Sequence, residues 1–130
     1  MKKMEIEVLV VGAGVSGILP HDTIAVGTYG LDIWGAHLSR EEARVPGYGI
    51  PYPALVPKDI DGLLLAGKAI SGTHIAMSAY RVMPIVGSIG QAAGVASAVC
   101  IKQKRQPREI RPEDVRKILR RKNQNLQIEL

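Results

Sequence analysis

The sequence predicts an α/β fold, and three observations carry that prediction. Apolar runs at residues 5–11 and 62–67 have the length and composition of strands buried on both faces of a sheet. Residues 84–104 are rich in glycine and alanine and are long enough for a core helix. Residues 112–122 carry the apolar stripe of an amphipathic helix. We therefore expect a small parallel or mixed sheet with a buried helix and a C-terminal helix.

The size of the chain favours one domain. It has 130 residues, 46% of them hydrophobic, which is too short for separate cofactor and substrate domains. We expect a strand and turn at 1–19, an extended connection at 22–61, a strand and buried helix at 62–104, and a basic helix and tail at 105–130. The single cysteine, Cys100, excludes an internal disulfide. Without a signal-peptide pattern at the N-terminus, the expected location is cytoplasmic.

A glycine motif follows the first apolar run directly. Gly12, Gly14 and Gly17 fit G-x-G-x-x-G, and the preceding strand is the context that a dinucleotide site requires. The glycines permit a tight turn, let backbone N–H groups approach a pyrophosphate and let a helix lie close to the strand. We expect Gly12, Ala13, Gly14, Val15 and Gly17 to bind a pyrophosphate in a truncated Rossmann-like fold. The alternative is a tight turn without a ligand.

Pro20 interrupts the unit that should follow this motif. A proline at that position would end the helix within its second turn. A complete unit also needs an acidic residue about twenty positions on, at the end of a second strand. Asp32 is the nearest acid, and no convincing strand precedes it. The adenosine half of the site is therefore expected to be incomplete.

The connection at 22–61 is expected to be extended. Glycines punctuate its first part, Ser39 with the following glutamates permits at most one helical turn before Pro46, and three prolines lie within residues 51–57.

The helix at 84–104 is expected to be buried on all sides. Its residues are small or apolar nearly all round, so either protein or lipid must surround it. Residues 82–101 carry no charge and include Gly90-x-x-x-Gly94, as some membrane helices do. However, Pro84, Gln91 and several serines make its transfer into lipid unfavourable. We expect protein around it and no membrane.

The C-terminal tail is basic. From Ile101 onward, ten Lys or Arg residues stand against four acids, a net charge of about +6. Pro112 followed by Glu113 and Asp114 is a good helix start. We expect the cations to form a solvated helix face. A nucleic-acid partner is not expected, because the tail has no aromatic residue to stack on a base. The final residues, 126–130, alternate as a strand would.

Three sequence motifs indicate a known family. They are I-P-Y-P-A-L-V-P at Ile50–Pro57, L-L-A-G-K-A-I-S at Leu64–Ser71, and R-V-M with G-Q-A-A-G within Arg81–Gly94. Their order and spacing resemble the C-terminal part of FAD-dependent oxidoreductases of the glutathione-reductase-like class. The resemblance covers most of residues 22–121, together with the N-terminal strand and glycine motif. In that family a long stretch separates the two parts, so this chain resembles a member without its middle, joined at Pro20.

The resemblance implies FAD as cofactor and a set of contacting residues. Gly12, Gly14 and Gly17 would face the pyrophosphate, and Gly67, Lys68 and Ala69 the ribityl and phosphate region. Arg81, Val82 and Met83 would begin the helix whose N–H groups point at N1 and the C2 carbonyl of the flavin. That placement makes physical sense because a helix N-terminus stabilises the negative charge of a reduced flavin.

Other chemistry-bearing residues leave alternatives open. His21, His37 and His74 show no ligand spacing, so no metal site is expected. Arg81 could neutralise flavin charge or fix a loop. Trp34 could cover an isoalloxazine face or simply pack. No residue stands out as a catalytic base, and the small-molecule substrate stays unknown.

Two functions follow from these observations. The first is an FAD-binding protein in which the flavin transfers hydride or electrons. The second is a non-catalytic nucleotide-binding or oligomeric interaction module, left by loss of the substrate domain. In either case a second copy of the chain or another partner chain is expected to cover the exposed core.

Overall fold

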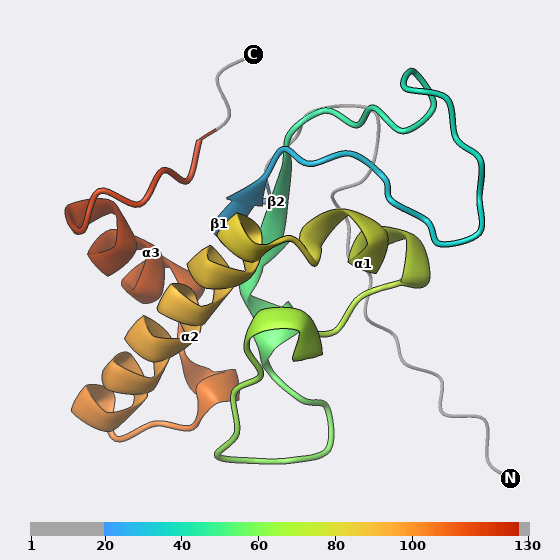
Figure 1. Ribbon diagram of the computed structural model, residues 1–130. Coiled ribbons are helices and arrows are strands. Elements are labelled where there is room, and N and C mark those ends of the chain that lie inside the picture. The colour runs from blue at the N-terminus through green and yellow to red at the C-terminus, as the bar shows by residue number, and fades with distance from the viewer. Residues whose placement is uncertain (1–19, 128–130) are drawn as a thin grey trace, which may run out of the picture.

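A computed structural model describes residues 20–127 (Figure 1). The strand expected at 5–11 and the glycine motif of residues 12–17 lie outside the described residues. The elements are β1 (Thr23–Gly27), β2 (Tyr48–Pro51), η1 (Tyr52–Leu55), η2 (Gly67–Ala69), α1 (His74–Tyr80), α2 (Met83–Gln103), η3 (Pro107–Glu109) and α3 (Pro112–Arg121), where η marks one turn of 3-10 helix.

The sheet within residues 20–127 has two antiparallel strands. Gly27 of β1 pairs with Tyr48 of β2, and Thr23 pairs with Pro51. Glycine is required at position 27, because a Cβ there would lie 2.5 Å from the Tyr48 ring. A parallel pair needs a crossover connection, usually a helix, but residues 28–47 form only turns and loop. The two described strands are thus antiparallel, and a parallel or mixed sheet is not confirmed within residues 20–127.

The prediction of a strand at 62–67 is wrong. Residues 63–66 have no assigned secondary structure, and Gly67 begins the single turn η2. Leu65 N donates to Leu55 O at 2.7 Å, but no ladder extends that bond among the described residues. An apolar run becomes a strand only where a neighbouring strand accepts its backbone groups. Here the run is extended chain that lies beside η1.

Helix α2 is the central element, as expected, and its bounds are shifted by one residue from 84–104. Pro84 lies in its first turn, and Lys104 ends it in the left-handed conformation, with φ of 53°. One side of α2 lies against β1 and α3 (Figure 1). The side chains buried there are Ile85, Ile89, Ala92, Ala93, Ala96 and Val99.

The opposite side of α2 is exposed, which corrects the expectation of burial all round. Met83 is 85% exposed and Ile101 is 79% exposed. Among the described residues, a Cβ built at Gly87, Gly90 or Gly94 would meet nothing within 4 Å. The buried side draws its apolar area from Ile and Val, whereas the exposed side consists mainly of glycine and other small residues. A helix without charges can therefore still have an open side.

Helix α3 confirms the expected C-terminal helix, and it fixes the sheet. Its Val115 and Leu119 are buried, and its Arg116 Nη1 donates to Thr23 O at 2.9 Å. Just beyond α3, Gln124 Nε2 donates to Ile24 O at 3.1 Å. Residues 124–127 form no strand.

Helix α1 was not anticipated from the sequence. Thr73 Oγ1 accepts a hydrogen bond from Ala76 N at 3.1 Å and caps its first turn. At its other end, Tyr80 is fully buried and its hydroxyl donates to Ile70 O at 3.2 Å. The short helix thus connects η2 to the start of α2.

Candidate cofactor site

The N-terminus of α2 is the feature that could hold an anionic group. The first N–H groups of a helix have no partner within it. Val82, the residue before the helix, has no side chain able to accept them, and no side chain caps this end. Pro84 has no N–H, so Met83 and Ile85 supply the donors of the first turn. Met83 is exposed, and a ligand can therefore approach this end of the helix.

The turn η2 lies beside the first turns of α2. Gly67 begins η2 with φ of +64°, a conformation that L side chains rarely adopt. A Cβ on Gly67 would also lie 3.4 Å from Val86 Cγ1 on α2. Lys68 and Ala69 are exposed. This glycine therefore lets the backbone of η2 run close to the helix.

Arg81 is held by a loop that is distant in sequence. Its Nη2 donates to Asp32 Oδ2 and to the Asp32 carbonyl oxygen, each at 2.8 Å. Of the two roles left open for Arg81, the structure shows the loop contact. Asp32, considered above as a ribose-binding acid, instead anchors the loop at residues 28–47 to the start of α2. No sequence pattern predicts this pairing, because 49 residues separate the partners.

The predicted cofactor residues are brought together only in part. Gly67–Ala69 and Arg81–Met83 meet at one end of α2, since η2 and α2 are in contact. Gly12, Ala13, Gly14, Val15 and Gly17 lie outside the described residues. The described part of the chain therefore contains only those residues that were expected near the flavin ring and the ribityl chain.

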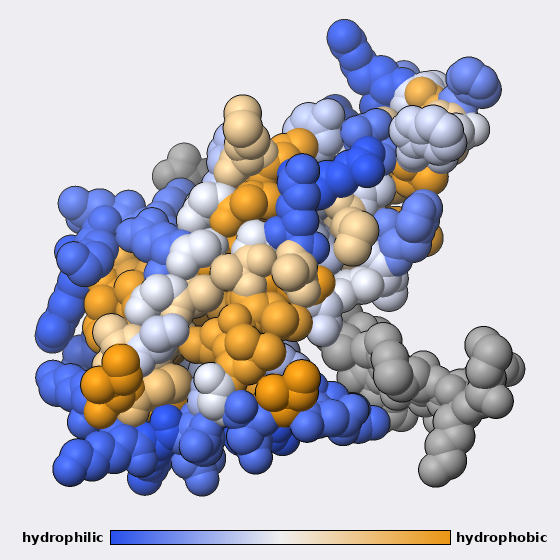
Figure 2. Space-filling view, turned by 60° about the horizontal axis from the view of Figure 1, so that its bottom comes forward, coloured by the Kyte–Doolittle hydropathy of each residue, from blue (hydrophilic) through white to orange (hydrophobic). Residues whose placement is uncertain are grey.

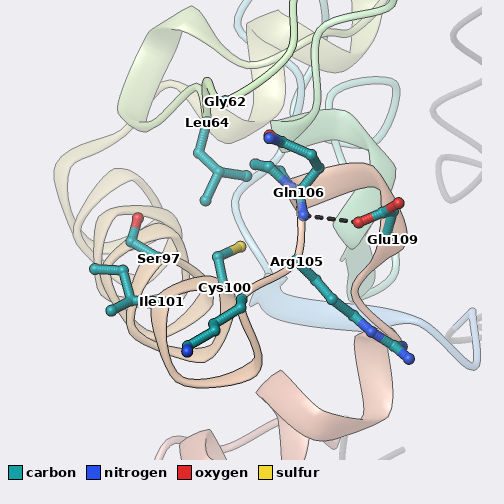
Figure 3. Close-up of a pocket in the computed structure, with 10 residues that line it drawn as sticks. Gly62, Leu64, Ser97, Cys100, Ile101, Arg105, Gln106 and Glu109 are labelled. Carbon is teal, nitrogen blue, oxygen red and sulfur yellow. Dashed lines mark hydrogen bonds between the residues drawn. The ribbon is translucent and has the colours of Figure 1, made fainter.

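A pocket of about 400 Å³ lies at the opposite end of α2 (Figure 3). Leu64, Ser97, Cys100 and Ile101 line one side, and the chain from Lys104 to Pro107 with Glu109 and Gly62 completes it. Burial raises the pKa of the Cys100 thiol. Of the predicted cofactor residues that the structure describes, none lines this pocket.

The other candidate functional residues, the three histidines and Trp34, do not come together in a site within the described residues. His21, His37 and His74 are exposed, and residues 20–127 contain no group of three potential metal ligands. Trp34 is 91% exposed, so it covers nothing within the described residues. Helix α2 is long and apolar enough to cross a membrane by length and composition alone, a test that core helices of soluble proteins also pass.

The chain belongs to a known family. Residues 19–119 match the sequence model of the FAD dependent oxidoreductase family, which is more than half of the chain. Membership in this family makes FAD the cofactor. The match begins after the glycine motif and includes η2 and the whole of α2. No curated protein and no solved structure matches the chain.

Proposed function

We propose that this chain binds FAD at the junction of η2 and the N-terminus of α2, and that the bound flavin transfers hydride or electrons. The observation that carries the proposal is the first turn of α2, where no side chain caps the Met83 and Ile85 N–H groups and where Val86 lies against Gly67 of η2. Family membership supplies the cofactor for which this geometry is suited.

The residues present fit the flavin-ring end of FAD. A reduced flavin carries negative charge at N1 and the C2 carbonyl, and backbone N–H groups at a helix N-terminus stabilise such charge. When bound, FAD supplies the electron-accepting ring, and the protein binds it, orients it and tunes its potential. The left-handed Gly67 lets the η2 backbone approach the cofactor without a side chain between them.

The pyrophosphate end of the proposed site rests on the glycine motif. Gly12, Ala13, Gly14, Val15 and Gly17 would bind the pyrophosphate through backbone N–H groups, and Lys68 and Ala69 would lie nearer the ribityl chain. In this proposal the chain is a truncated Rossmann-like FAD-binding domain of the glutathione-reductase-like class, with one cofactor site and a missing middle.

The exposed side of α2 favours the second candidate, an interaction module. A chain that lost its substrate domain would retain a surface on which another chain could dock. Cofactor binding would use the first turn of α2 and docking its exposed side; the two share Met83, so docking is tested on the flavin-free chain and through positions away from that turn.

The cofactor proposal is tested by mixing the full chain with excess FAD, desalting it and recording its absorption. Trp34 is the only tryptophan, and the Arg81–Asp32 contact holds its loop near the start of α2. We expect retained flavin bands, lost on denaturation, and quenching of Trp34 emission by energy transfer. A colourless protein after desalting would rule out the proposed site.

A further inference from the structure

We propose that a second copy of this chain docks antiparallel on the exposed side of α2, so that Met83 of each copy enters the pocket at the far end of the other copy's helix. The surface involved consists of Met83, Gly87, Gly90, Gly94, Ser97 and Ile101, and we call it the glycine face. This inference does not depend on FAD binding.

The glycine face forms one straight surface. Its residues are spaced four or three apart, which places them on one side of a helix with 3.6 residues per turn. From Met83 to Ile101 it is about 27 Å long, at 1.5 Å per residue. Because Cβ atoms at Gly87, Gly90 and Gly94 would meet nothing within 4 Å in residues 20–127, a partner helix could approach the backbone closely.

The two ends of this face complement each other. Met83, at one end, is 85% exposed and presents an unbranched, adaptable side chain. At the other end, Ile101 and Ser97 border the pocket of about 400 Å³, and Leu64 and Cys100 lie beside them (Figure 3). A protruding apolar side chain therefore lies at one end of the helix, and at the other end lies a hollow with Leu64, Cys100 and Ile101 on one side and the polar chain from Lys104 to Glu109 on the other. Figure 2 shows hydrophobic residues gathered at the centre of one face of the molecule, with hydrophilic residues around them.

A twofold axis on the exposed side of α2, between Gly90 and Gly94, would bring these features together. Antiparallel pairing about that point places Met83 opposite Ile101 and Gly90 opposite Gly94 of the other copy. Each copy then supplies one protruding methionine and one pocket, so the contact is closed and self-complementary. Parallel pairing would instead place Met83 against Met83 and leave both pockets unfilled.

Charge is compatible with antiparallel docking. No charged residue lies between Val82 and Ile101, so the centre of the contact would desolvate no ion. Lys102 of one copy would lie near the Arg81–Asp32 ion pair of the other copy, in which the Asp32 side chain is 58% exposed. The two helix dipoles would also point in opposite directions.

The area of the glycine face sets the expected strength. A strip about 27 Å long and about 10 Å wide covers roughly 270 Å² on each copy. Even with Met83 and the pocket walls added, the total stays below the roughly 1,200 Å² of standard stable interfaces. We therefore expect a weak dimer, with a Kd between about 10 µM and about 1 mM.

Sedimentation velocity on the flavin-free full chain, from about 1 µM to about 1 mM, tests this proposal. The Gly90→Leu variant should fold, because its Cβ enters open space, and it should weaken the dimer at least about tenfold by holding the helices apart. Lys117→Leu, which adds the same apolar side chain at an exposed position of α3, is the matched control and should leave the dimer unchanged. A full chain that stays monomeric throughout overturns the proposal, as does a dimer that Gly90→Leu leaves intact.

Oxidative cross-linking tests the orientation. In a Met83→Cys variant, the new thiol should form a disulfide with Cys100 of the other copy, and adding Cys100→Ser should abolish this cross-link. Cross-linking that persists in the double variant would show parallel packing through position 83 and contradict the proposal. A monomer whose thiol at position 83 resists alkylation would instead identify residues 1–19 of the same chain as the occupant, and would also overturn it.

Discussion

Arg81 Nη2 donates two hydrogen bonds of 2.8 Å to Asp32, one to the carboxylate and one to the carbonyl oxygen. The contact joins the loop at residues 28–47 to the turn that starts α2. Trp34 and Met83, each two positions from one of the partners, are both highly exposed. Arg81 is therefore a positioning residue, because it fixes a loop at the end of the helix where we place the flavin.

Replacing Arg81 with alanine should weaken FAD binding about three- to tenfold by releasing this loop. The unfolding free energy should fall by no more than about 1 kcal/mol, because both partners are substantially exposed. Titration with FAD, followed by Trp34 emission, measures the affinity. Arg121→Ala removes an exposed cation from α3 and serves as the control. If the two variants bound FAD equally well, the positioning role of Arg81 would be wrong.

Position 83 permits a test of a single backbone donor. A proline is tolerated at the first position of a helix, and Val82 already has the extended conformation that precedes proline. Met83→Pro removes the N–H and the side chain, whereas Met83→Ala removes the side chain alone. Because a backbone donor to a neutral carbonyl contributes about 0.5–1.5 kcal/mol, Met83→Pro should bind oxidised FAD about three- to tenfold more weakly than Met83→Ala. Equal affinities would exclude this N–H as a flavin contact.

Gly67 should tolerate substitution poorly. An alanine there would adopt a positive φ at a cost of about 1–2 kcal/mol, with its Cβ in contact with Val86. Gly67→Ala should therefore lower both the unfolding free energy and the FAD affinity. Gly87→Ala, in the open side of α2, should instead stabilise the chain by about 0.5–1 kcal/mol. Urea unfolding at low protein concentration compares the two, and a Gly67→Ala variant as stable as the original chain would contradict the account.

Two buried tyrosines should make the fold sensitive to alkali. Burial raises the pKa of Tyr48 and of Tyr52 to about 12, from 10.0, and for Tyr52 the negative charge of the Cys100 thiolate adds to the effect. Between pH 10 and 12 the folded chain keeps phenolic protons that the unfolded chain has lost, so unfolding releases protons and stability falls as pH rises. The slope should be about 1.4 kcal/mol per pH unit for each tyrosine.

The Tyr52→Phe variant isolates one of these contributions. It should be less stable at neutral pH, by about 1–2 kcal/mol, because Tyr52 donates to the Pro107 carbonyl at 2.8 Å. Its stability should also fall less steeply above pH 10. Tyr29→Phe, at a residue that is 46% exposed, should change neither property. If the free energy of unfolding of Tyr52→Phe fell as steeply above pH 10 as that of the original chain, Tyr52 would be excluded as a source of this pH dependence.

Local sequence signals identified the helices that begin at a proline. Pro84 and Pro112 each lie in the first turn of a helix. The uncharged run after Pro84 and the apolar stripe after Pro112 give α2 and α3 to within one residue. Helix α1 could have been predicted from Thr73, whose side chain caps it. However, a segment of seven residues is too short for a helical pattern of apolar residues to be recognised.

The features that sequence reasoning missed depend on neighbours distant in the chain. The run at 63–66 has the composition of a strand, but only its contact with Leu55 decides its conformation. The open side of α2 could not be foreseen either, because small residues allow a helix to be buried and equally allow it to remain uncovered. The Arg81–Asp32 contact likewise arises only when the loop folds back onto α2.

The midpoint potential of the bound flavin tests the central claim most directly. If the first N–H groups of α2 face N1 and the C2 carbonyl, they stabilise the negatively charged reduced flavin more than the oxidised one. We predict a potential more positive than that of free FAD, and a shift back toward the free value in Met83→Pro but not in Met83→Ala. A bound flavin with the potential of free FAD, unchanged by Met83→Pro, would contradict the placement of the cofactor at α2.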